Sequence, residues 1–182
     1  MLDIHISQDY NQLKFALVSL KFQQTSGMKI ANHIIEPATL ADLEKLVVLE
    51  QRLFETDKFS RKNLRYLIQR ATVIVVRTER ERNIIGYAIL LGRKNSRKAR
   101  IYSLGVAESV SRTGIGTKLV STLEVIAAIR NCTSLTLEVS DTNKAALLFY
   151  NKCGFKQYGF RYNYYKDGGH ALLMRKIVGF SS

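Results

Sequence analysis

The stretch that decides the fold of this chain is IYSLGVAESVSRTGIG, residues Ile101 to Gly116. Its first part is typical of a β-strand, and its second part is a glycine turn that opens a helix. At a helix start several backbone N–H groups lack an intrahelical partner, and the dipole places partial positive charge there. Gly114 and Gly116 remove side chains that would keep an anion away, while Arg112 and Lys118 add charge. The stretch predicts an anion site, although a structural turn explains the two glycines equally well.

Two other phosphate-binding patterns do not fit this turn. A dinucleotide-binding fold would need GxGxxG, but Leu119 occupies the third glycine position. A P-loop would need GxxxxGK[ST], which is also absent. The meaning of the turn therefore depends on the segments around it.

Hydrophobic periodicity outward from this stretch predicts an α+β domain. The expected strands are 33–36, 72–77, 83–91, 100–106, 135–139, 155–162 and 171–176, and the expected helices are 39–54, 60–70, 114–130 and 143–153. The 182 residues fit one domain, which we place at 33–182, after an N-terminal extension of uncertain structure at 1–32. No apolar run approaches the ~20 residues of a membrane span, and no signal-peptide pattern begins the chain, so we expect a cytoplasmic location.

The strongest compositional signal is the formal charge of +13, from 28 basic and 15 acidic residues. Five of the basic residues cluster at Arg93, Lys94, Arg97, Lys98 and Arg100. Such an excess suits a polyanion such as nucleic acid, the ribosome, an acidic protein or a phosphate-rich cofactor. Solvated charges that only aid solubility are an equal alternative.

Cysteine and histidine spacing predicts no metal centre. Cys132 and Cys153 form no CxxC pattern, and both lie in apolar-rich segments that favour packing roles. His5, His33 and His170 have no metal-ligand spacing.

Four motifs in register resemble the GNAT acetyltransferase superfamily: IYSLGV, SRTGIG, LTLEVS and NKAALLFYNKCGF, between Tyr102 and Phe155. The resemblance extends through most of Ile34 to Ile177, and the later NYY is most similar to the ribosomal-protein-alanine N-acetyltransferase branch. It implies a mixed, mostly antiparallel sheet flanked by helices on both faces, with acetyl-CoA as co-substrate and no metal.

The resemblance also implies which residues bind CoA. The pyrophosphate would lie on the backbone of Ser111, Arg112, Thr113, Gly114, Ile115, Gly116 and Thr117. Leu104, Gly105 and Val106 would pair with the pantetheine arm before the neighbouring strands splay, and Asn143 would contact the same arm. The family usually has Gln or Arg in place of Ser111, so this chain lacks one long polar side chain near the phosphates. Weaker CoA affinity with intact backbone donors is the expected consequence.

By the same resemblance Glu138 is the general base, Tyr150 the general acid, and Tyr164 and Tyr165 line the acceptor site. The residues themselves agree in part, since strand alternation places Glu138 on the face opposite Leu135, Leu137 and Val139. Without the resemblance, an exposed strand glutamate and a core tyrosine would be the ordinary interpretations.

The acceptor is constrained by the need for a neutral amine. A protein α-amine, with a pKa of about 7.8, costs about 1 kcal/mol to deprotonate at pH 7, whereas a lysine near 10.4 costs about 4.6 kcal/mol. One glutamate therefore favours a protein N-terminus. A small amine, a lysine or an aminoacyl-tRNA remains an alternative acceptor, and a ribosome- or nucleic-acid-binding module with a degenerate GNAT fold is the alternative from another class.

Overall fold

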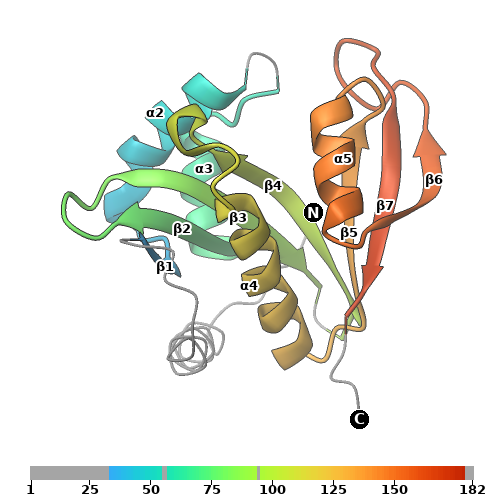
Figure 1. The fold of residues 1–182 in the computed structure, drawn as a ribbon, viewed down its shortest axis with the longest axis horizontal. Coiled ribbons are helices and arrows are strands. Elements are labelled where there is room, and N and C mark those ends of the chain that lie inside the picture. Colours follow the sequence, from blue (N-terminus) through green and yellow to red (C-terminus); the bar gives the residue numbers. More distant parts are fainter. Residues whose placement is uncertain (1–32, 55–56, 94, 179–182) are drawn as a thin grey trace.

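The computed structural model describes residues 33–54, 57–93 and 95–178, so the predicted extension at 1–32 lies outside the described residues. In this part, seven strands form one sheet in the order β1-β2-β3-β4-β5-β7-β6 (Figure 1). The strands are β1 (His33–Pro37), β2 (Thr72–Thr78), β3 (Ile84–Gly92), β4 (Lys98–Val106), β5 (Ser134–Ser140), β6 (Lys156–Arg161) and β7 (Ala171–Ile177). Neighbouring strands are antiparallel except β4 and β5, which are parallel.

The helices begin where their capping residues predict. They are η1 (Leu40–Asp42), α2 (Leu43–Leu53), α3 (Arg61–Arg70), η2 (Glu108–Val110), α4 (Ile115–Ile129) and α5 (Lys144–Lys152). The Ser60 hydroxyl accepts a hydrogen bond from the Asn63 N–H at 3.2 Å and caps α3. Thr39 and Asp42 form a capping box before α2. The predicted order of strands and helices is confirmed.

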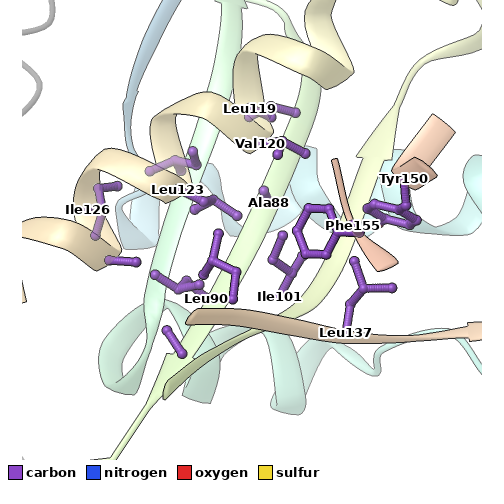
Figure 2. Close-up of a cluster of buried hydrophobic side chains, with 14 of the residues drawn as sticks. Ala88, Leu90, Ile101, Leu119, Val120, Leu123, Ile126, Leu137, Tyr150 and Phe155 are labelled. Carbon is purple, nitrogen blue, oxygen red and sulfur yellow. The ribbon is translucent and has the colours of Figure 1, made fainter. Parts of the chain in front are cut away.

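Helices cover both faces of the sheet, as expected. In Figure 1, α4 lies in front of the strands, while α2 and α3 lie behind them. Figure 2 shows Leu119 and Leu123 of α4 pointing toward Ala88 and Leu90 of β3, within one buried cluster. A second cluster joins α2 and α3 to the opposite face of β2 and β3. The fold is therefore the mixed, mostly antiparallel α+β architecture that the sequence predicts.

The sheet opens between β4 and β5. These strands pair only from Lys98 to Arg100 on β4 and from Ser134 to Thr136 on β5. β4 stays paired with β3 as far as Val106, so beyond Arg100 it keeps one partner and loses the other. Figure 1 shows the two strands meeting at their lower ends and diverging upward, with α5 over β5. The strands therefore splay before Leu104, and not after Val106 as the resemblance implies, which leaves one edge of the second half of β4 without a strand.

β4 begins two residues earlier than the periodicity predicts. Ala99 and Arg100 pair with Gly92 and Leu91 of β3, and the same segment pairs with β5. The basic residues there resemble a loop in sequence, because exposed lysines and arginines hide the alternation of Ala99 and Ile101, which are both buried.

No helix among the described residues is long and apolar enough to cross a membrane. Within the same residues, no cluster of three or more His, Cys, Asp or Glu could hold a metal ion.

Candidate active site

The glycine turn lies at the start of α4 and exposes backbone donors. Gly114 has φ of 89°, a left-handed conformation that favours glycine, and Arg112 has φ of 60°. The first helical hydrogen bond runs from the Lys118 N–H to the Gly114 carbonyl at 3.0 Å. The N–H groups from Arg112 to Thr117 have no acceptor within the described part of the chain. They form a helix-start site suited to an anion.

The two glycines of this turn have different roles. A Cβ on Gly114 would meet nothing within 4 Å, so the space in front of the turn is open. A Cβ on Gly116 would lie 3.1 Å from Cζ of Phe149, so this glycine lets α4 pack closely on α5. Open space and unpaired donors therefore lie where the resemblance places the pyrophosphate of CoA.

Ser111, at the beginning of the predicted cradle, differs from the residues after it. Its N–H donates to the Glu108 carbonyl at 2.9 Å and is already satisfied. The Thr113 hydroxyl donates to the Val110 carbonyl at 2.7 Å, which fixes the bend before Gly114. The backbone donors left for an anion therefore begin at Arg112.

The free edge of β4 presents the backbone of Leu104 and Val106. The Ala107 N–H donates to the Ile85 carbonyl at 2.8 Å, and hydrogen-bonded pairs alternate along an antiparallel ladder. The alternation directs the N–H and C=O groups of Leu104 and Val106 away from β3, toward the divergence. The side of Gly105 that would carry a side chain faces α2, because an added Cβ would lie 2.5 Å from Cδ1 of Leu53. The three residues predicted to hold pantetheine thus form an edge that an extended group can pair with.

Glu138 lies across the divergence from β4 and forms an ion pair. Its Oε2 is 2.6 Å from Nε of Arg100, and the side chains of Arg100 and Glu138 are 33% and 11% exposed. These two atoms do not meet hydrogen-bond geometry, so the contact is an ion pair and not an aligned hydrogen bond. A terminal nitrogen of Arg100 donates to the Tyr164 hydroxyl at 2.7 Å. One guanidinium thus joins the predicted base to a predicted acceptor-site residue.

Tyr150 contributes a buried phenol and Tyr165 a partly buried one. Tyr150, 9% exposed, lies on α5 with its ring against Phe149 and Phe155. Figure 2 shows the rings of Tyr150 and Phe155 side by side. Burial, with smaller effects of Cys153 and Tyr165, raises the pKa of Tyr150 above its usual value of 10.0. Burial, followed by the nearby Tyr164 and Glu138, raises the pKa of Tyr165 to about 12. Both phenols therefore keep their protons through the neutral range.

Asn143 caps α5. Its side-chain oxygen accepts a hydrogen bond from the Ala146 N–H at 3.0 Å, so this atom stabilises the helix start. The amide NH₂ group of Asn143 remains able to donate to another partner.

Sequence reasoning missed Arg100 as a site residue. The residue was grouped with the surface cluster from Arg93 to Lys98, because its partner Glu138 lies 38 positions further along the chain. Its ring contact with Tyr102, at 5.2 Å from guanidinium to ring centre, also depends on the folded chain. The feature of the sequence that could have identified Arg100 as a site residue is its position beside Ile101, at the start of the strand that carries the site.

A double-mutant cycle tests the Arg100–Glu138 pair. Arg100→Met leaves a largely buried carboxylate without its cation, so the free energy of unfolding should fall by about 1–3 kcal/mol. Adding Glu138→Gln removes that unpaired charge and should restore part of the loss, a coupling of about 0.5–3 kcal/mol in urea denaturation. Strictly additive losses would contradict the pairing.

A second polar cluster contacts β4 on the face of the sheet that α2 covers. Glu50 of α2 is 1% exposed, and its carboxylate accepts hydrogen bonds from the Tyr87 hydroxyl and, at 3.0 Å, from the Phe59 N–H. The Tyr87 hydroxyl lies 3.0 Å from the Ser103 hydroxyl on β4. Burial raises the pKa of Glu50, although Tyr87, Phe59 and Lys58 oppose the shift. The cluster ties the loop after α2 to the strand that carries the site.

The raised pKa of Glu50 predicts a pH effect on stability. The folded state holds this proton more tightly than the unfolded state, whose value is near 4.5, so Glu50 favours folding most below pH 4.5. That contribution is lost as the pH rises through the raised pKa. Glu50→Gln cannot titrate and should therefore gain stability relative to wild type between pH 4.5 and pH 7.5, measured by urea denaturation. The exposed control Glu79→Gln should show no comparable drift; an equal drift would contradict the assignment.

The chain is similar in sequence and in structure to known acetyltransferases. Residues 40–155 match the model of the acetyltransferase (GNAT) family. The chain is 31% identical over 144 residues to an uncharacterized N-acetyltransferase of Methanocaldococcus jannaschii, covering 79% of this chain and 90% of that protein. It is 27% identical over 166 residues to an N-alpha-acetyltransferase of Sulfolobus acidocaldarius, covering 85% and 98%. The crystal structure of the ribosomal-protein-S18-alanine N-acetyltransferase from Escherichia coli matches with a TM-score of 0.71 at 24% identity, covering 82% and 96%.

A sheet that opens beside a helix-start anion site defines the class of acetyl-CoA-dependent N-acetyltransferases, and this chain is an enzyme of that class. It belongs to the GNAT acetyltransferase family. Its structural neighbours include ribosomal-protein-alanine N-acetyltransferases.

Proposed function

We propose that this enzyme acetylates the α-amine of protein N-termini. The observation that carries the proposal is Glu138, a largely buried carboxylate paired with Arg100 at the divergence of β4 and β5. One carboxylate is a sufficient base for an α-amine with a pKa of about 7.8, and less so for a lysine near 10.4. The N-alpha-acetyltransferase relative from Sulfolobus acidocaldarius supports this choice of acceptor.

The donor side of the site is assigned to backbone groups. Bound acetyl-CoA supplies an activated acetyl thioester. The N–H groups from Arg112 to Thr117 hold its pyrophosphate, the edge of β4 at Leu104 to Val106 holds the pantetheine arm, and the NH₂ of Asn143 contacts that arm. The Val106 N–H, directed into the divergence, polarises the thioester carbonyl.

Two side chains move the protons. Glu138 takes the proton from the attacking amine, directly or through one water, as the new C–N bond forms. Tyr150 gives its phenolic proton to the sulfur as the C–S bond breaks. Arg100 holds one oxygen of Glu138 in place, which leaves Oε1 for the amine. Tyr164 and Tyr165 lie beside the acceptor, and Arg100 positions the first of them.

A matched acceptor panel tests this function. The wild-type enzyme is given acetyl-CoA with N-terminal peptides, the same peptides with a blocked α-amine and an internal lysine, spermidine, and an aminoacyl-tRNA. Mass shifts should appear for the free N-terminal peptides. Reaction confined to the small amine, the lysine or the aminoacyl-tRNA would show that the acceptor assignment is wrong.

A further inference from the structure

One end of the sheet gathers four chain segments that are distant in sequence. The turn between β3 and β4 lies beside the loop before β5, because the Thr133 N–H donates to the Arg97 carbonyl at 2.7 Å. The Val178 N–H donates to the Thr133 carbonyl at 2.9 Å, which brings in the end of β7. The segment between α3 and β2 joins them, since Thr72 pairs with Leu90. We call residues 68–72, 91–93, 95–100, 129–135 and 175–178 the hairpin end.

The hairpin end is basic and contains no acidic residue. Its described residues include eight lysines and arginines and no Asp or Glu. Two of the eight, Arg100 and Lys176, already pair with Glu138 and Glu124. Five others have exposed side chains: Arg70, Arg93, Arg97, Lys98 and Arg175. By contrast, the turn between β2 and β3 at the opposite end alternates Glu79, Arg80, Glu81 and Arg82.

We propose that the hairpin end binds the phosphodiester backbone of folded RNA. Four of its five exposed cations are arginines, whose planar fork contacts phosphate oxygens in pairs. Cations concentrated on one surface without interspersed carboxylates form the electrostatic footprint of a phosphate contact. Specific sequence readout is not required, because phosphate contacts fix position and orientation on their own.

The apolar content of this surface disfavours a membrane or a protein partner. The turn at 92–98 reads GRKNSRK and has no aromatic or aliphatic side chain to insert into a bilayer. Ile129 and Ile177 are exposed nearby, but as separate side chains and not as the apolar centre that a protein interface needs.

The exposed cations of the hairpin end lie far from the glycine turn. β4 is nine residues long and runs from the hairpin end at Lys98 to the free edge at Val106, a span of about 26 Å at ~3.3 Å per residue. RNA at one end would therefore not cover the glycine turn at the other. The inference rests on the proposed function, which it deepens: the acceptors would be protein N-termini presented next to RNA, as in ribonucleoprotein particles.

A matched pair of triple variants tests the proposal. The probe is a fluorescent hairpin copied from ribosomal RNA, and anisotropy titrations are repeated over a series of salt concentrations. Replacing Arg93, Arg97 and Lys98 by Ala should weaken binding about tenfold or more near 0.1 M salt and lower the slope of log K against log salt by about two to three. Replacing Arg65, Arg80 and Lys62 by Ala removes the same charge elsewhere and should change the affinity less than threefold.

Equal weakening in both triple variants would overturn the proposal, because affinity would then follow net charge alone. Wild-type binding to anionic phosphatidylserine vesicles or to polyglutamate that matches or exceeds RNA binding would overturn it as well. Peptide acetylation is measured on the same preparations and should survive in both variants. If wild type acetylates no N-terminal peptide but binds RNA as described, the proposed function fails and the RNA surface stands.

Discussion

Glu138→Gln should lower kcat/KM for peptide acetylation by about 10²–10⁴-fold, the range that a positioned general base contributes. Glutamine keeps the size of the side chain and its place opposite Arg100 but cannot take a proton from the amine. CoA binding should change less than about threefold, since the carboxylate lies on β5 and the CoA donors lie at the start of α4. Steady-state kinetics and calorimetric CoA titration separate the two effects.

A pH series sharpens this prediction. An α-amine with a pKa of about 7.8 loses its own proton as the pH rises, so the defect of Glu138→Gln should shrink above about pH 8.5. The control Glu124→Gln removes a carboxylate that pairs with Lys176 on the other face of the sheet, and it should keep wild-type kcat. Near-normal turnover by Glu138→Gln at pH 7 would exclude Glu138 as the base.

Tyr150→Phe should lower kcat by about 10²-fold with little change in KM or in thermal stability. The buried phenol keeps its proton at neutral pH, because burial raises its pKa, and can therefore donate to the leaving sulfur. Phenylalanine fills the same space between Phe149 and Phe155, so the core should remain packed. Single-turnover rates with saturating acetyl-CoA measure the chemical step directly.

The matched control is Tyr158→Phe on β6, which removes a phenol hydroxyl from a half-exposed ring that stacks with Arg175. It should leave kcat unchanged. Two results would contradict the role of Tyr150: full kcat in Tyr150→Phe, or a loss of activity that only parallels a fall in Tm.

Local patterns were sufficient for most of the fold. The 3.6-residue period of Leu119, Leu123 and Ile126 predicts α4, and each of these residues is buried. The predicted helices 60–70 and 143–153 start at Ser60 and Asn143, and in the structure both side chains cap the helices α3 and α5. Strand alternation predicts that Glu138 leaves the apolar face of β5. These features depend on neighbours within a few residues, which a sequence displays directly.

The candidate site was only partly predictable. The glycine turn stands out from the sequence, and Glu138 is singled out only by the resemblance. The backbone amide of Ser111 is already bonded to Glu108, which depends on the short helix η2. Gly116 resembles a phosphate-facing glycine and also makes room for Phe149. Glu50 resembles a surface residue of α2, yet it is buried against Tyr87.

The sequence by itself determined the order of elements, the glycine turn at a helix start and the face on which Glu138 lies, since these follow from short-range periodicity and turn chemistry. Only the tertiary structure decided that β4 and β5 part after Arg100 and that this arginine joins Glu138 to Tyr164. It also decided that the basic residues gather at one end of the sheet. These three features depend on how distant strands are packed, because charges and hydrogen bonds act across space regardless of separation along the chain.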